Sequence, residues 1–309
     1  MLTCEKLKKK PHQFQSFTGI PVHEFEKMFA ELKDTHEQFE QRRFGGRPRQ
    51  RALGAGRSFK HDLATRVLMC LVHLRLNLTV AVMGYLFDLD QANISRNLVQ
   101  MRGFLNRHLP KSPRIKAAHG KINSLEELCR LYPDLKAIVD GTEQPIQRPQ
   151  DSEKQKSYYS GKKKRHTIKK QIVVNRDGLI LDTSPAVEGR RHDFKLFEDH
   201  QTLSQVIPKE VEVLADSGYQ GAEKLDPDRK IRLPKKASKL HPLTEEQKAG
   251  NRALSSIRVR VEHVLGRLKC FRILSDRFRH RLGSYDEIFD TVAGLVNFMR
   301  IQRLGLIIP

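Results

Sequence analysis

The sequence KAIVDGTEQP at residues 136–145 decides the fold. Its apolar, β-branched first half predicts a strand that ends on Asp140. The sequence VEVLADSGYQG at residues 211–221 repeats this pattern and predicts a strand that ends on Asp216. In open α/β sheets, active sites tend to lie at the carboxyl ends of strands. If the two strands are neighbours, the two acids converge; the alternative is that each is an ordinary turn aspartate.

The sequence around these two strands predicts a mixed sheet with flanking helices. A hairpin is expected from residues 166–175 and 179–182, which are joined by the turn Asp177-Gly178. A short helix is expected near 193–198, a fifth strand near 231–233, and two long helices at 245–269 and 284–304. This order predicts an α/β domain over residues 131–305 with a ribonuclease-H-like, five-stranded mixed sheet, by analogy of fold alone.

The residues before this domain predict an all-α region. Residues 1–56 are expected to form helices followed by the basic connector GGRPRQR at 45–51. In this connector Arg47 and Arg49 either lie along DNA or belong to a solvated loop. Residues 57–112 predict three short helices, with Thr79 and Asp90 as N-caps of the second and third, in a helix-turn-helix arrangement.

The third of these helices is expected to present a polar outer face. Amide and arginine side chains are those that read base edges in the major groove. The alternative is a helical bundle with a solvated polar face. The expected outer residues are Gln91, Asn93, Arg96, Asn97 and Gln100.

Composition favours a polyanionic partner. The 309 residues contain 57 Lys and Arg against 36 Asp and Glu, which gives a formal net charge of +21. DNA or RNA is the leading partner, and a merely basic or ribosome-associated protein is the alternative. The four cysteines show no CxxC pair, and neither a signal-peptide core nor a membrane-spanning run is present. A cytoplasmic protein with no membrane partner is expected.

The long helix at 245–269 contributes a third candidate acid. Its apolar residues recur on one face, and Glu262 lies just beyond the edge of that face, on the same side as Arg258 and Lys269. Three carboxylates suit phosphodiester chemistry, because two Mg²⁺ ions about 4 Å apart need oxygen ligands. The alternative for Glu262 is a surface glutamate paired with Arg258.

The most concentrated positive feature is the sequence SYYSGKKKRH at residues 157–166. Because two aromatic residues and a glycine accompany the charges, contact with phosphates or a flipped base is favoured over a solvated surface. The residues expected to make it are Tyr158, Tyr159, Lys162, Lys163 and Lys164. His192 is either a metal ligand or general base, or a structural hydrogen-bonding residue.

These motifs together resemble transposases of bacterial insertion sequences of the insertion-sequence-five type, in the DDE superfamily that includes Harbinger elements. The resemblance rests on VDGTEQPI at 139–146, YYSGKKK at 158–164, ADSGYQG at 215–221 and the helix from Asn251 to Lys269. GRP at 46–48 and the helix-turn-helix also look like this family.

The resemblance implies a DDE endonuclease and strand-transferase with Asp140, Asp216 and Glu262 as the catalytic and metal-binding acids. It implies two Mg²⁺ ions, for which Mn²⁺ can substitute, and action on the terminal inverted repeats of an element and on target DNA. A homodimer or larger assembly on DNA in the bacterial nucleoid is expected. The alternatives are a domesticated DNA-binding protein that does not cut and a structure-specific nuclease without transposition.

Overall fold

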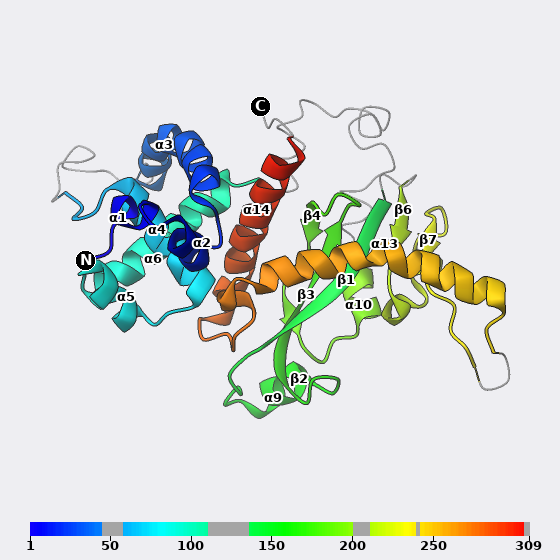
Figure 1. Cartoon of the computed structure of the whole chain (residues 1–309). Coiled ribbons are helices and arrows are strands. Elements are labelled where there is room, and N and C mark those ends of the chain that lie inside the picture. Colours follow the sequence, from blue (N-terminus) through cyan, green and yellow to red (C-terminus); the bar gives the residue numbers. More distant parts are fainter. Residues whose placement is uncertain (45–57, 111–135, 200–210, 239–241, 306–309) are drawn as a thin grey trace. The chain divides into compact units, whose positions relative to one another are not determined.

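A computed structural model describes residues 1–44, 58–110, 136–199, 211–238 and 242–305 of the chain (Figure 1). Its contacts divide the chain into two compact units. The helical unit comprises Met1–Leu109 with Cys270–Ile273, and the sheet unit comprises Pro110–Lys269 with Leu274–Pro309. Among the described helices, none has the length and apolarity needed to cross a membrane.

The helical unit is built from short amphipathic helices around one apolar core. Pro11 begins α2 at a position where its missing N–H costs nothing, and Gly19 ends that helix at φ 79°. The core lies mainly around α4, in which every residue from Thr65 to Leu74 is buried. The described helices are α1 Cys4–Lys8, α2 Pro11–Thr18, α3 Val22–Phe44, α4 Leu63–Leu76, α5 Val80–Phe87 and α6 Gln91–His108.

The predicted helix-turn-helix is confirmed in α5 and α6, with one local difference. Thr79 caps α5 by accepting a hydrogen bond from the Val82 N–H at 3.4 Å. Asp90 is the N-cap residue of α6, but its side chain makes no capping hydrogen bond. The turn between the helices is tight, because a Cβ on Gly84 would lie 2.7 Å from the Leu89 carbonyl oxygen.

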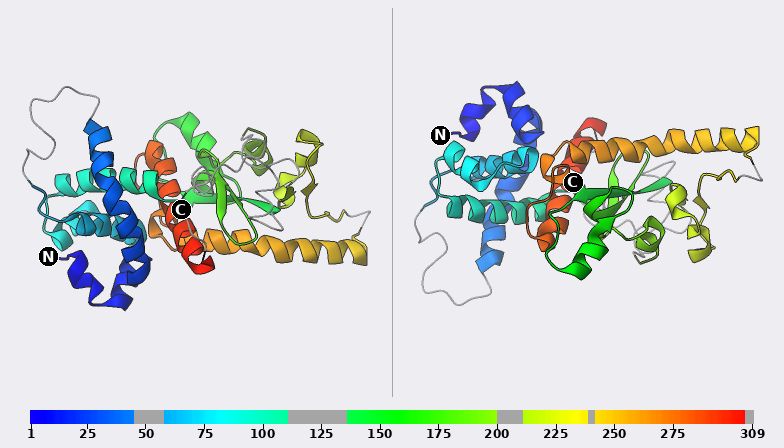
Figure 2. Two further views of the ribbon diagram at one scale, coloured as in Figure 1. Left: turned by 90° about the horizontal axis from the view of Figure 1, so that it is seen from above. Right: turned by 90° about the horizontal axis from the view of Figure 1, so that it is seen from below.

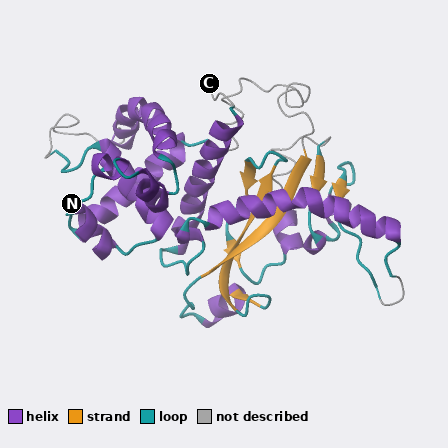
Figure 3. Ribbon diagram, viewed as in Figure 1, coloured by secondary structure: helices purple, strands orange, loops and turns teal. Residues whose placement is uncertain are grey.

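The sheet unit contains the predicted mixed sheet (Figure 3). In the described part of the chain it has seven strands, three of which (β2, β5 and β7) have two residues each, and its main order is β2-β3-β1-β6-β7. Strand β1 pairs antiparallel with β3 and parallel with β6, and β4 and β5 also pair with β3. The strands are β1 Lys136–Pro145, β2 Tyr159–Ser160, β3 Arg165–Val174, β4 Ile180–Thr183, β5 Val187–Glu188, β6 Glu212–Leu214 and β7 Ile231–Arg232.

The prediction that β1 ends on Asp140 is wrong, because β1 continues to Pro145. Its partner β3 has ten residues and pairs with β1 from Ile138 opposite Val174 to Pro145 opposite Thr167. By contrast, β6 pairs with β1 only over Lys136–Ile138. Asp140 therefore lies within β1, just past the point where β6 ends.

Helices cover both faces of the sheet. On one face, Val139 packs in a buried cluster with Phe197 of α10 (Asp193–Asp199) and Tyr219 of the 3-10 helix η1 (Ser217–Tyr219). The opposite face is covered by α13 (Glu245–Lys269), which runs along the sheet and contacts β1 and β3 (Figure 2). The other helical segments of the unit are α9 Ser152–Tyr158, α12 Ala222–Leu225, η2 Arg272–Leu274 (in part), η3 Leu282–Ser284 and α14 Tyr285–Leu304.

Polar contacts attach α14 to the sheet. The Asn297 amide accepts from the Ile180 N–H at 2.8 Å and donates to the Ile180 carbonyl at 2.9 Å. Lys170 is 1% exposed, and its ammonium pairs with Asp286 at 2.6 Å and Asp290 at 3.2 Å. A buried ammonium of this kind needs both its partners to offset the loss of hydration.

The Lys170 contacts lead to a stability prediction. Lys170→Met should lower the free energy of unfolding by about 3 kcal/mol, because two carboxylates lose their buried partner. Urea denaturation measures the change. The control is Lys156→Met, which removes an exposed pair with Glu153 and should change stability by less than about 0.5 kcal/mol. Equal effects of the two substitutions would contradict the role assigned to Lys170.

Candidate functional site

The pairing of β1 with β6 brings two acids together. Ile138 lies opposite Leu214 in this parallel pair, and Asp140 and Asp216 each follow two positions later. Since side chains alternate between the faces of a strand, both carboxylates are directed to the face covered by α13. Backbone N–H groups fix them locally: Asp140 accepts from Gly141 and Asp216 accepts from Gly218, each at 2.7 Å.

The environment of Asp140 disfavours its charged form. The pKa of this carboxyl is raised to about 6, chiefly by burial and to a smaller extent by the neighbouring charges of Asp216 and Asp193. The Gly141 N–H and the Arg258 guanidinium act in the opposite direction. A cation bound beside Asp140 would stabilise its charged form, because the positive charge offsets the cost of burying the carboxylate.

Asp193 is part of this acidic site, although the sequence pattern did not single out its carboxylate. Asp193 pairs with Lys169 at 3.0 Å, and Lys169 also pairs with Glu143 at 3.4 Å. Lys169 is 6% exposed and donates to the Arg191 carbonyl at 2.7 Å. The only sequence signal was its position directly after the candidate His192. The structure leaves His192 exposed, whereas Asp193 begins α10 and lies close enough to the acids for its charge to raise the pKa of Asp140.

The Tyr219 hydroxyl is also directed toward the acids. Tyr219 is fully buried, and its hydroxyl has no hydrogen-bond partner within the described residues. Burial raises its pKa, and the charges of Asp193, Asp140 and Asp216 add to this effect. A buried hydroxyl without a partner is costly, so its presence beside three carboxylates points to a polar ligand in this space.

One side of α13 carries cations toward the acids. The charge of Arg258 lowers the pKa of Asp140. Burial and the charge of Lys163 lower the pKa of Lys269, whereas the charges of Asp140 and Glu143 raise it. Glu262 lies between Arg258 and Lys269 on this side of the helix and is exposed. The structure thus brings Lys163, Arg258 and Lys269 to the acidic pair and places Glu262 on the adjoining helix face.

The basic run and the tyrosines before it lie at the surface. Lys162, Lys163 and Lys164 are exposed in the turn between β2 and β3, where Lys164 adopts a left-handed conformation with φ 53°. Tyr159 is 43% exposed and packs edge-on against His166 at 5.6 Å between ring centres, while Tyr158 is half-buried. These side chains are open to a ligand at the surface.

The oxygen atoms at the site fit a hard divalent cation in part. Among the described residues, no three acidic, histidine or cysteine side chains enclose a metal position by themselves. Mg²⁺, however, commonly binds only one or two carboxylates, keeps several waters and takes further oxygens from substrate phosphates. The adjacent carboxylates of Asp140 and Asp216, with the unpartnered Tyr219 hydroxyl nearby, meet this requirement.

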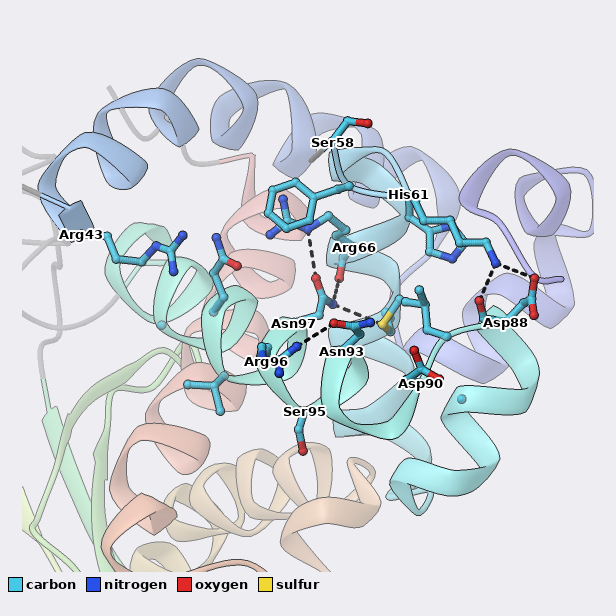
Figure 4. Close-up of a pocket in the computed structure, with 18 of the residues that line it drawn as sticks. Arg43, Ser58, His61, Arg66, Asp88, Asp90, Asn93, Ser95, Arg96 and Asn97 are labelled. Carbon is cyan, nitrogen blue, oxygen red and sulfur yellow. Dashed lines mark hydrogen bonds and ion pairs between the residues drawn. The ribbon is translucent and has the colours of Figure 1, made fainter. Parts of the chain in front are cut away.

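The helical unit contains an open cavity of about 1510 Å³ beside α6 (Figure 4). The outer residues Asn93, Arg96 and Gln100 line it, together with Arg43 and Lys60 from the segments facing α6. Arg96 donates to Asn93 at 2.8 Å, and both residues are exposed, as is Gln91. A groove beside an exposed amide- and arginine-bearing helix suits a nucleic-acid strand.

Asn97 was expected on this outer face, and that prediction is wrong. Asn97 is 8% exposed; it accepts from the Arg66 Nε at 3.0 Å and donates to the Arg66 carbonyl at 3.1 Å. Arg66 is buried in α4 and needs an acceptor, which the Asn97 amide supplies (Figure 4). Arg47 and Arg49 lie outside the described residues.

Comparison with known proteins identifies relatives along most of the chain. The family described as DDE superfamily endonuclease matches residues 139–297, and the helix-turn-helix of DDE superfamily endonuclease matches residues 62–111. A protein of Microchaete diplosiphon, described as a transposase for insertion sequence element IS702, is 32% identical over 79% of this chain and 83% of its own length. A protein of Streptomyces albus G, described as a transposase for insertion sequence element IS112, is 26% identical over 86% of this chain and 87% of its own length. No solved structure matches the chain.

The buried position of Asn97 yields a prediction. Asn97→Ala should lower the free energy of unfolding by about 1–3 kcal/mol, because the buried Arg66 Nε loses its acceptor. Arg96→Ala on the exposed face should change it by less than about 0.5 kcal/mol. Urea denaturation of both variants checks the pair; an Asn97→Ala protein as stable as Arg96→Ala would show that Asn97 is not structural.

The raised pKa of Asp140 yields a second prediction. The folded protein binds a proton at Asp140 near pH 6, whereas the unfolded chain does so near pH 4, so ionisation at high pH destabilises the fold. With chelator present, Asp140→Asn should raise the free energy of unfolding by about 1–3 kcal/mol at pH 8. This gain should shrink as the pH falls from 6 to 4. Denaturation at several pH values measures it, and a gain independent of pH would contradict the assignment.

Proposed function

Because this chain belongs to the DDE superfamily transposases of insertion sequences, we propose that it binds the terminal inverted repeats of its element, cuts phosphodiester bonds there and joins the freed 3′-hydroxyls to target DNA. The observation that carries this proposal is the pair Asp140 and Asp216, set side by side by the parallel pairing of β1 with β6. A DNA-binding helix-turn-helix in the same chain supports it.

Asp140, Asp216 and Glu262 are proposed as the residues that hold two Mg²⁺ ions, with Mn²⁺ able to substitute. When bound, such ions supply an activated nucleophile and offset negative charge on the attacking and leaving oxygens. Asp140 lies within β1 and Asp216 follows the end of β6, so the paired strands hold the backbone that carries both acids. Glu262 is exposed on α13 and is proposed as the third ligand of the set.

The surrounding cations are proposed to hold the DNA backbone over the acids. Lys269 on α13 and Lys163 in the β2–β3 turn lie close enough for the charge of Lys163 to lower the pKa of Lys269. Arg258, Lys162 and Lys164 extend this positive rim, and Tyr158 and Tyr159 offer ring surfaces on which an unpaired base can stack.

The helical unit is proposed to recognise the element ends. Gln91, Asn93 and Arg96 are the exposed side chains of α6 with the chemistry to read base edges. Arg47 and Arg49 in the connector are proposed to follow the backbone. Because two ends must be joined, the active form on DNA is proposed to be a homodimer or larger assembly in the nucleoid.

A cleavage assay tests this function. The substrate is a plasmid carrying the DNA that flanks the gene, and the proteins are the native chain, Asp216→Asn and the control Glu223→Gln. Asn keeps the shape of Asp216, so only the charge at the acidic pair is lost, whereas Glu223 is exposed on α12. Cleavage at the element ends should require Mg²⁺ and fall by more than about 100-fold in Asp216→Asn, since even residues behind metal ligands cost 10–100-fold.

The other outcomes separate the alternatives. Tight, salt-sensitive binding to the ends without cleavage under any condition would indicate a domesticated DNA-binding protein. Metal-dependent cleavage without joining, irrespective of the end sequence, would indicate a nuclease that does not transpose.

A further inference from the structure

Asp193 reaches the acidic pair from the opposite face of the sheet. It begins α10, and α10 packs through Phe197 on the face to which Val139 points. The carboxylates of Asp140 and Asp216 are directed to the other face. Asp193 nevertheless lies close enough for its charge to raise the pKa of both Asp140 and Tyr219. Asp193 therefore borders the site from the α10 face of the sheet, whereas the two acids point to the α13 face.

Two glycines leave room for the Asp193 carboxylate, because neither has a Cβ. A Cβ on Gly141 would lie 3.2 Å from Asp193 Oδ1, and a Cβ on Gly218 would lie 3.1 Å from Asp193 Oδ2. Gly141 directly follows Asp140, and Gly218 binds the Asp216 carboxylate through its N–H. The Asp193 carboxylate thus occupies the space beside both glycines, with Oδ1 toward Gly141 and Oδ2 toward Gly218.

Lys169 fixes this orientation. Its ammonium lies 3.0 Å from Asp193 Oδ1 and is itself anchored by Glu143 and by the Arg191 carbonyl. Lys169 is paired in register with Glu143 on the neighbouring strand β1, so its position is determined by the sheet. The ion pair holds Asp193 Oδ1 and leaves Oδ2 directed toward the Gly218 turn.

The ion pair with Lys169 accounts for part of the negative charge of Asp193, but the site as a whole keeps an excess of carboxylates. The described site gathers four carboxylates and three cations: Asp140, Glu143, Asp193 and Asp216 with Lys169, Arg258 and Lys269. The buried Tyr219 hydroxyl, which has no partner among the described residues, independently indicates that a polar ligand belongs beside these acids.

Resting on the cation site proposed above, we propose that Asp193 is a positioning residue that raises the divalent-cation affinity of Asp140 and Asp216. Held by Lys169, its carboxylate restrains Gly141 of β1 and the Gly218 turn, each beside one of the acids, and adds negative charge there. The excess of negative charge is then offset when the cation binds.

Mn²⁺ binding to the DNA-free protein tests this role without depending on activity. The full chain and three variants are titrated with Mn²⁺ by electron paramagnetic resonance or calorimetry, and their thermal unfolding is recorded. Asp193→Asn removes the charge and keeps the shape. Glu198→Gln is the matched control, because it lies on the same helix and makes an exposed pair with Lys195 at 2.6 Å. Asp216→Asn reports on the acidic pair itself.

Asp193→Asn should bind Mn²⁺ at least tenfold more weakly than the native chain, with Tm and circular dichroism close to native. Glu198→Gln should stay within twofold of native. If Asp193→Asn also stays within twofold while Asp216→Asn weakens binding, the role of Asp193 is overturned and the cation site stands. If Asp216→Asn has no effect either, the cation site at the acidic pair is overturned, and the role of Asp193 falls with it.

A second variant covers the case in which Asp193→Asn destabilises the fold. Lys169→Met combined with Asp193→Asn removes the buried ammonium together with its partner, and Glu143 keeps its hydrogen bond from Thr167 at 2.9 Å. This double variant should show the same tenfold loss of Mn²⁺ affinity. Native affinity in the double variant would overturn the proposal.

Discussion

The parallel pairing of β1 with β6 is the constraint on which the rest of the site depends. It extends over only three residue pairs, and it ends two residues before Asp140 and Asp216. A shift of the register by one residue would turn one of the two acids to the opposite face of the sheet. Because β3 pairs with β1 along nearly its whole length, β1 continues past the end of β6 and presents Asp140 on a rigid strand.

This arrangement costs stability in the absence of a ligand. Asp140 is buried with a pKa near 6 and is repelled by Asp216, and the Tyr219 hydroxyl has no partner among the described residues. These features favour a state in which a cationic or polar ligand lies beside the two acids. Lys169 and Arg258 offset part of the negative charge from opposite faces of the sheet. Such sites are maintained by stable surroundings, here the buried cluster of Val139, Phe197 and Tyr219.

Sequence periodicity predicted those features that depend on local pattern. The helix at 245–269 has the bounds expected, and the helix-turn-helix and the mixed sheet are present. Periodicity did not predict features that depend on residues distant in the sequence. The length of β1 is set by its pairing with β3, and Asn97 is buried because Arg66 needs an acceptor. Asp193 lies beside the acids because α10 packs on the sheet. Helical spacing alone did not distinguish Asn97 from the exposed Asn93 and Arg96.

The most direct test of the central claim, that Asp140 and Asp216 together hold a catalytic cation, is a change of metal specificity. Asp216→Cys replaces a hard oxygen ligand by a softer sulfur, which disfavours Mg²⁺ more than Mn²⁺. The measurement is cleavage of DNA carrying the element ends, with each metal in turn. If Asp216 binds the cation directly, the variant is folded, is inactive with Mg²⁺ and regains cleavage with Mn²⁺. Equal cleavage with both metals, at the native level, would contradict direct coordination by Asp216.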